Sequence, residues 1–278
     1  MIEERLSIVN SKSQTTRQNI KGFIHHEDYQ MILVDTPGFI DEPAYQLQLN
    51  MNSYIELALE ETDIILLVVD KYSALEENHP LIVAIKAAKK PIVLAINKVD
   101  QCSPEEVLKL TEYYARFLNL KDSISISVEL KIGREALISI LVENLPVHPP
   151  YFETEDYTDR NLRFFCSEII REKIFSTYQK EIPYSSEVVI NKFLEKVDSA
   201  IIEATIYVER ESQKKIVIGH NAEKLKQISI AARKEIETYM DTKVHLFIFV
   251  KVLDNWRNKE KTLEKFGYFS PNKSNDKR

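Results

Sequence analysis

Two short polar motifs carry residue types that could bind a phosphorylated nucleotide. Asp35-Thr36-Pro37-Gly38 starts with a carboxylate that can hold a magnesium-bound water, and its glycine lets the backbone N–H approach a phosphate closely. Asn97-Lys98-Val99-Asp100 ends with a carboxylate that can accept two hydrogen bonds, from the ring N–H and the amine of guanine. Adenine lacks that donor pair, so Asp100 would reject it. The alternative is that Asp35 and Asp100 only cap helices in loops.

The residues around Asp100 would complete a base site. We expect Asn97 to tie the base to neighbouring loops and the stem of Lys98 to lie over the ring. A third motif, Ser127-Val128-Glu129, follows the next apolar segment of the chain. All three motifs come at the ends of predicted strands and in this order, which makes coincidence a poor explanation.

Short apolar segments separated by helical patterns must position these motifs. We predict strands over Tyr29–Asp35, Ile64–Asp70, Ile92–Asn97 and Ser123–Ser127, and helices over Leu81–Lys89 and from Ser103 onward. Strands that are apolar on both faces are typical of a parallel sheet with helices on both sides. The front half, residues 1–150, is therefore predicted to be a doubly wound α/β domain, with its polar site at the C-terminal strand ends.

Composition excludes several other kinds of site. The chain has only five glycines and none is followed by lysine, so the 278 residues contain no phosphate-binding loop of the G-x-x-x-x-G-K-[ST] type. Cys102 and Cys166 are too few for a disulfide framework or a thiolate zinc site, and a reducing cytosol is expected. The six histidines show no metal-ligand spacing, and no apolar run is long enough to span a membrane. The start of the chain lacks the layout of a signal peptide.

Taken together, the motifs resemble those of the Era family of bacterial GTPases, and the resemblance covers nearly the whole chain. Besides the three motifs above, it rests on Leu6-Ser7-Ile8-Val9, Gln14-Thr15-Thr16-Arg17, Tyr157–Arg160, Ser167–Lys173, Pro183-Tyr184-Ser185, Lys251-Val252, Trp256-Arg257 and Phe266-Gly267-Tyr268. The resemblance implies a Ras-like GTPase domain joined to a C-terminal type II KH domain. It also implies that Ser127 and Val128 lie in a base-contacting loop, with valine where alanine is usual.

The resemblance implies GTP or GDP with Mg²⁺ as cofactors, and one of Thr15 or Thr16 as a magnesium-sensing threonine beside Asp35. As partners it implies the 3′-end region of small-subunit ribosomal RNA and the small ribosomal subunit, during assembly of that subunit. We expect a cytoplasmic monomer that binds no DNA, with peripheral membrane contact as an open alternative.

The family's central strand and phosphate-binding loop would lie before Met1. Two interpretations stay open. Either the true start lies upstream, or the chain is an RNA-binding KH protein with a non-catalytic, nucleotide-free pseudo-GTPase domain.

The rear half of the chain is predicted to bind RNA. Residues 201–278 carry a net charge of +5, whereas the whole chain carries −6. We predict a helix over 158–178, strands over Ser186–Lys196, Ile201–Glu209 and Val244–Val252, and a helix over Ala222–Met240 with a break near Ser229 left open. This α-β-β-α-β order is typical of a type II KH domain over 183–269, preceded by a linker and leading helix over 151–182 and followed by a flexible tail over 270–278.

Gly219-His220-Asn221-Ala222 occupies the position of the KH loop that clamps RNA, with alanine replacing the second glycine of the G-x-x-G pattern. Four lysines lie around this loop and could meet phosphates: Lys214, Lys215, Lys224 and Lys226. The alternative is a plain turn that joins two elements.

We predict that the chain of 278 residues hydrolyses GTP negligibly, because the lysine and the serine or threonine of a phosphate-binding loop are absent from it. A phosphate-release assay on the purified chain checks this prediction. Turnover comparable with that of a relative that carries the loop would contradict it.

Overall fold

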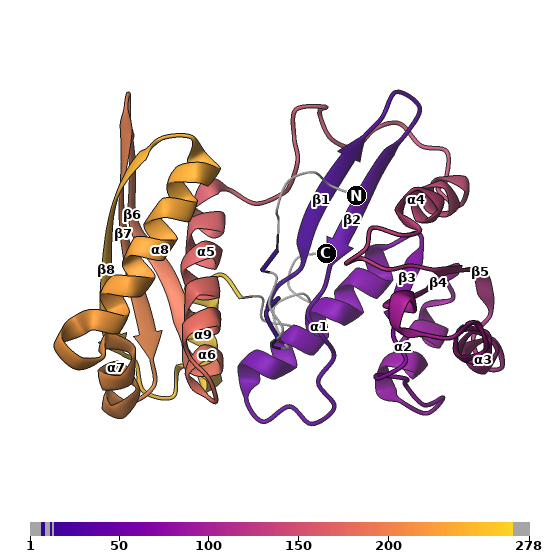
Figure 1. Cartoon of the computed structure of the whole chain (residues 1–278), viewed down its shortest axis with the longest axis horizontal. Coiled ribbons are helices and arrows are strands. Elements are labelled where there is room, and N and C mark those ends of the chain that lie inside the picture. Colours follow the sequence, from indigo (N-terminus) through magenta and orange to yellow (C-terminus); the bar gives the residue numbers. More distant parts are fainter. Residues whose placement is uncertain (1–6, 9–11, 13, 269–278) are drawn as a thin grey trace. The chain divides into compact units, whose positions relative to one another are not determined.

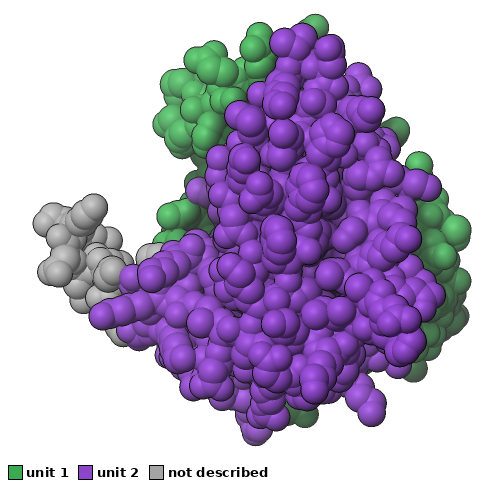
Figure 2. Space-filling view, turned by 90° about the vertical axis from the view of Figure 1, so that its left-hand side faces the viewer, with its two compact units in different colours: residues 1–3, 22–34, 55–157 green, residues 4–21, 35–54, 158–278 purple. Residues whose placement is uncertain are grey.

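The computed structural model describes residues 7–8, 12 and 14–268, which fall into two compact units (Figures 1 and 2). Unit 1 comprises residues 1–3, 22–34 and 55–157, and unit 2 comprises residues 4–21, 35–54 and 158–278. Leu6 and Val9, in a segment that resembles the first switch region of the family, and the expected tail over 270–278 lie outside the described residues. None of the described helices is both long and apolar enough to cross a membrane.

The first half of the chain alternates strands and helices. In chain order its elements are β1 (Ile20–His25), β2 (Gln30–Asp35), α1 (Gln46–Glu61), β3 (Ile65–Val69), α2 (Pro80–Ala88), β4 (Ile92–Ile96), the 3₁₀ turn η1 (Val99–Gln101), α3 (Pro104–Ala115), β5 (Leu120–Ser125) and α4 (Arg134–Glu143). Strands β3, β4 and β5 form a parallel sheet with β4 in the centre. The predicted α/β alternation is confirmed.

Helices of unit 1 cover both faces of the central strand β4, whose residues are all buried. On one face Leu94 packs with residues of α2 and α3, including Ile82 and Tyr114. On the other face Val93 packs with residues of α4, including Leu137. Burial on both faces explains why this segment is apolar throughout rather than alternating.

Helices α1 and α4 lie where the sequence analysis predicted no element, and two further features of the front half differ from the prediction. Strand β1, which the sequence analysis did not predict, forms a hairpin with β2 through a turn closed by His26 and Tyr29. Among the described residues this hairpin is a separate sheet, and β2 is not paired with β3. The resemblance implies a further central strand in the middle of the sheet of the front half. The separation between the β1–β2 hairpin and the β3–β4–β5 sheet lies where that strand is expected.

The second half of the chain forms a three-stranded sheet covered by helices on one face (Figure 1). Its elements are α5 (Leu162–Thr177), α6 (Ile182–Ser185), β6 (Glu187–Lys196), β7 (Ser199–Val208), α7 (Glu211–Ile218), η2 (His220–Ala222), α8 (Glu223–Met240), β8 (Lys243–Val252), η3 (Trp256–Asn258) and α9 (Glu260–Lys265). Strand β7 lies in the centre, antiparallel to β6 and parallel to β8. Its Ile202 and Ala204 are fully buried against residues of α5 and α8, such as Ile170 and Ile236.

The predicted element order of this half lacked the helices α6, α7 and α9, and one suggested break is wrong. Helix α7 lies between β7 and the loop at Gly219, where the prediction had no element. Its N-terminus is closed by Gln213, whose side-chain oxygen accepts from the backbone N–H groups of Glu209 and Arg210 at 2.9 and 3.1 Å. Helix α8 is continuous through Ser229, whose hydroxyl donates within the helix to the carbonyl oxygen of Leu225 and so does not compete for a break.

Candidate functional site

The guanine motif lies at the C-terminal ends of β4 and β5 in unit 1. The side-chain oxygen of Asn97 accepts a hydrogen bond from the backbone N–H of Val128 at 3.1 Å, so this residue ties the two loops together, while its contact with the base stays a prediction. The loop of Ser127 is closed on itself, because Ser127 and Ile132 exchange two backbone hydrogen bonds. The 3₁₀ turn that carries Asp100 is attached to β5 through Val99, whose N–H donates to Ile126. The sequence motifs at these two strand ends therefore form one structural group.

Lys98 is held in place by Asp70, a residue at the end of a predicted strand, and no sequence pattern indicates that these two residues pair. Its ammonium donates to the carboxylate of Asp70, at the end of β3, at 2.6 Å. Partial burial would raise the pKa of Asp70, but hydrogen bonds from Lys98, Ser73 and the Tyr72 backbone outweigh it and lower that pKa. Lys98 has φ 60°, in the left-handed region, and its ammonium lies 5.7 Å from the centre of the Tyr72 ring. Asp70 therefore fixes the end of the Lys98 side chain, whose placement over a base stays a prediction.

The carboxylate of Asp100 is exposed beside this group, and it forms no hydrogen bond or ion pair with the described residues. A carboxylate in this state retains both oxygens as acceptors. The side chain of Val128 is 68% exposed in the neighbouring loop, so it can contact a ligand. These features fit a base that presents two adjacent donors.

The phosphate and magnesium motif belongs to unit 2. The carboxylate of Asp35 accepts hydrogen bonds from the hydroxyl of Thr16 at 3.0 Å and from that of Ser7 at 2.8 Å. Thr15 is held differently, because its backbone carbonyl accepts from Arg171 at 2.5 Å. Of the two threonines left open by the sequence, Thr16 is the one that faces Asp35.

The site at Asp35 fits the implied Mg²⁺, because Asp35 and Thr16 offer hard oxygen donors and Asp35 is exposed. Magnesium typically keeps waters and takes one or two protein ligands together with substrate phosphates. Within the described residues, no group of three or more histidine, cysteine, aspartate or glutamate residues could hold a metal by itself. Gly38 is exposed, and a Cβ added there would meet nothing within 4 Å, so the space beside this residue is open. Thr16 and Asp35 would therefore hold the ion only in company with a nucleotide.

The loop at Gly219 joins α7 to α8 in the position predicted from the sequence. Gly219 has φ 75° and ψ 177°, a conformation that is essentially restricted to glycine. Asn221 and Ala222 follow with φ 49° and 59°. His220, Asn221 and Ala222 are all exposed, so the loop presents backbone to solvent. A left-handed alanine is strained, which explains why the usual pattern has glycine at that position.

Lysines surround this loop. Lys224 and Lys226 are exposed on the first turn of α8, and Lys214 and Lys215 lie on the last turns of α7. The ammonium of Lys224 lies 5.4 Å from the centre of the Tyr178 ring, and the Tyr178 hydroxyl donates to Val217 at 2.7 Å. The resulting surface combines open backbone with positive charge, as required to grip a phosphate backbone.

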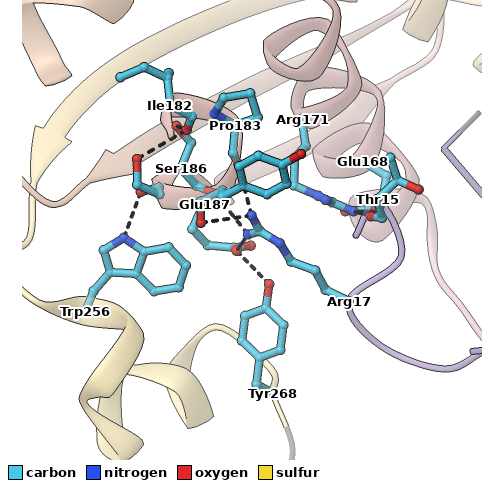
Figure 3. A network of polar contacts seen from close by, with 12 residues as sticks. Thr15, Arg17, Glu168, Arg171, Ile182, Pro183, Ser186, Glu187, Trp256 and Tyr268 are labelled. Atoms are coloured by element: carbon cyan, nitrogen blue, oxygen red, sulfur yellow. Dashed lines mark hydrogen bonds and ion pairs between the residues drawn. The ribbon is translucent and has the colours of Figure 1, made fainter. Parts of the chain in front are cut away.

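The segment around Thr16 and the KH fold meet in a buried polar network inside unit 2 (Figure 3). The guanidinium of Arg17, which is 4% exposed, forms an ion pair with Glu187 at 2.8 Å and donates to the carbonyls of Ser186 and Pro183 at 2.9 and 3.0 Å. Tyr268 donates to the same carboxylate at 2.6 Å. In the sequence Arg17 stands out only as part of a motif, and no signal there pairs it with Glu187.

Comparisons with known proteins agree with both halves of this description. The family model described as a 50S ribosome-binding GTPase matches residues 1–98, and the KH domain model matches residues 181–257. GTPase Era of Elusimicrobium minutum is 38% identical over 268 residues, which cover 95% of this chain and 89% of that protein. A chloroplastic GTPase ERA1 of Zea mays is 35% identical over 96% of this chain, which spans 65% of that relative's length.

Solved structures of Era have the same fold as this chain. The structure of an Aquifex aeolicus Era variant bound to GDP·AlF₄⁻ superimposes with a TM-score of 0.91 at 30% identity, covering 97% of this chain and 92% of that one. A structure of Era with MgGDPNP and nucleotides 1506–1542 of 16S ribosomal RNA gives a TM-score of 0.90 at 30% identity, with the same coverage. Similarity at this level over nearly the whole length, together with the two matched domain models, shows that the chain belongs to the Era family of GTPases.

Proposed function

We propose that this chain is a guanine-nucleotide-binding protein that binds small-subunit ribosomal RNA and acts in assembly of the small ribosomal subunit. The observation that supports it most is the coexistence of an ordered guanine group at Asn97–Asp100 with a KH loop at Gly219–Ala222. GTP or GDP with Mg²⁺ is the proposed nucleotide. We also propose that the chain acts as a monomer in the cytoplasm.

The RNA part of the proposal is supported by the relatives and by the loop. One solved Era structure contains a segment of 16S ribosomal RNA. In this chain the exposed backbone of His220–Ala222 and the lysines beside it offer the contacts that single-stranded RNA needs. The 3′-end region of that RNA is therefore the proposed ligand.

The alternative, a pseudo-GTPase half that binds no nucleotide, is disfavoured by contacts that serve no packing purpose. The Lys98–Asp70 pair is partly exposed, as is the Thr16–Asp35 hydrogen bond. Surface contacts of this kind contribute little to stability. Their presence at the expected guanine and magnesium positions is better explained by ligand binding.

Replacement of Asp100 by asparagine tests the guanine assignment. Asparagine offers one acceptor and one donor to the two donors of guanine, so we expect GDP affinity to fall by at least ~2 kcal/mol, or about 30-fold. Xanthine presents a donor beside an acceptor, which matches asparagine, so xanthosine diphosphate should bind the variant better than GDP does. Titration of both nucleotides by calorimetry or NMR measures the two affinities.

A matched control is available in the same unit. Asp63 is exposed and precedes β3, at the opposite end of the strand from Asp70, so Asp63→Asn removes the same charge away from the site. This control should bind GDP as the parent does. If Asp100→Asn keeps the GDP preference of the parent, Asp100 does not read the base and the guanine assignment is wrong.

A further inference from the structure

The outer face of the β6–β7–β8 sheet, on the side away from α5 and α8, is not used by the loop at Gly219 (Figure 1). In β8, Val244, Leu246 and Ile248 pack into the core with the helices. Because side chains alternate along a strand, Phe247 and Phe249 point to the opposite side. These two rings are 52% and 53% exposed. Half-exposed aromatic side chains side by side mark a surface built for a ligand rather than for the core.

The rings of Phe247 and Phe249 are spaced so that each can contact a different flat group of a ligand. They lie two residues apart on the same face, at a spacing of ~6.7 Å along the strand. Strand β8 is at the edge of the sheet, so one side of this row is open. Leu194 of β6, 45% exposed, points to the same side. The face is therefore a platform with two accessible aromatic surfaces, not a closed groove.

The charge on this face selects a polyanion over a typical protein partner. Lys251 lies on β8 next to the rings and Lys196 lies at the end of β6, both exposed. Of the two acidic residues at outward positions in these strands, Glu203 pairs with Lys192 at 3.4 Å, and Glu187 is buried. Exposed aromatic rings interleaved with unopposed lysines are typical of surfaces that bind single-stranded nucleic acid.

The platform is continuous with the loop that grips RNA. Helix α7 ends at Gly219 and packs against β8, and β8 runs parallel to β7 with Val252 opposite Val208. Helix α7, which ends at the loop, and the two rings therefore share the edge strand β8. At the Val252 end the outward Tyr207 packs on Phe266 with ring centres 5.2 Å apart, so the open part of the face lies around Phe247 and Phe249.

We propose that this outer face is a second surface for single-stranded RNA, on which bases stack on Phe247 and Phe249 while Lys251 and Lys196 meet phosphates. The proposal rests on the proposed RNA-binding function and extends it to a different face of the same fold. Every base has a flat face, so this surface adds affinity and length of binding site rather than sequence preference.

Fluorescence anisotropy of the full chain with two unlike probes tests the proposal. A four-nucleotide oligouridine fits the clamping loop alone, whereas a twenty-nucleotide oligouridine can also reach the sheet. The double variant Phe247→Leu/Phe249→Leu keeps the apolar surface and removes the rings. We expect it to bind the long probe roughly 10- to 100-fold more weakly than the parent, with the short probe unaffected. The matched variant Phe247→Tyr/Phe249→Tyr keeps the rings and should bind the long probe within about threefold of the parent.

Three results would overturn the proposal. The leucine variant could bind the long probe as tightly as the parent, or the parent could bind neither probe. The face could instead belong to a second copy of the chain, shown by a dimer in sedimentation that Phe247→Lys/Phe249→Lys dissolves without changing RNA affinity. A Gly219→Asp variant separates the two RNA surfaces. If it binds the long probe like the parent while the leucine variant does not, the loop assignment fails and the outer face stands.

Discussion

Replacement of Gly219 by aspartate is expected to weaken binding of single-stranded RNA by the full chain at least ~100-fold, when the probe is short enough to reach only the loop. The added carboxylate would lie where the backbone must touch a phosphate. A side chain is also poorly tolerated, because Gly219 has φ 75° and an added Cβ would lie 2.9 Å from Cγ of Lys224 and 3.2 Å from its backbone nitrogen. Both effects act on the same loop, so the loss should be large.

Two further substitutions separate the strain from the charge. Gly219→Ala introduces the steric conflict without the charge, so its loss of affinity should fall between those of the parent and Gly219→Asp. Ala222→Gly relieves a left-handed alanine and should bind at least as tightly as the parent. Lys224→Ala, at an exposed position, should weaken binding only modestly and flatten the dependence on salt by about one unit.

A gel-shift series with a short single-stranded RNA from the 3′ end of small-subunit ribosomal RNA measures these affinities, and circular dichroism confirms that each variant is folded. Parent-like affinity in a folded Gly219→Asp variant would show that the loop is only a turn. Such a result would leave the basic charge of the C-terminal part without its proposed contact point.

Local chemistry made most of the fold predictable. The segment at β4 is apolar on both faces because it is buried between helices, and Ser103-Pro104-Glu105-Glu106 begins α3 with a capping box, as its residue types suggest. Alternation along β8 likewise gave the strand to within one residue. Helix α7 was missed because it is only eight residues long, too short for a helical repeat of apolar residues to stand out from the end of the preceding strand.

The candidate site was predictable where one motif carries its own geometry, and not where two distant segments meet. Asn97, Lys98 and Asp100 follow one another at the end of β4, so their grouping in space follows from spacing. The partner of Lys98, by contrast, is Asp70, 28 residues away, and periodicity gives no pairing at that distance. The pair of Arg17 and Glu187 is separated by 170 residues and depends on how a loop segment packs against the KH fold.

Arg17→Ala is expected to lower the free energy of unfolding of unit 2 by about 3–5 kcal/mol, because it leaves the carboxylate of Glu187 buried without its cation. The guanidinium also supplies hydrogen bonds to two or more carbonyls, which lysine cannot match, so Arg17→Lys should recover only part of the loss. Urea unfolding followed by the fluorescence of Trp256 measures the change. This tryptophan is the only one in the chain, is fully buried in the same unit, and donates to Ser185 at 3.0 Å.

A partly exposed pair in the same unit serves as the control. Arg233→Ala removes a partner of Glu237 that remains in contact with solvent, so it should cost no more than about 1 kcal/mol. A loss of the same small size in Arg17→Ala would show that the buried network does not hold the Thr16 segment to the KH fold. The double variant Arg17→Met/Glu187→Gln replaces the pair with uncharged groups and should recover much of the stability, since no buried charge is left unpaired.

The dependence of the free energy of unfolding on pH gives a second measurement of the Arg17–Glu187 network. Burial raises the pKa of Glu187, and the charge of Arg17 opposes that rise. Without Arg17 the pKa rises further, so the folded variant takes up a proton at a pH where the unfolded chain does not. Stability linked to such a proton increases as pH falls through the folded pKa. The deficit of Arg17→Ala relative to the parent should therefore shrink between neutral pH and pH 5, whereas a constant deficit would mean that lost packing, not the stranded charge of Glu187, causes the instability.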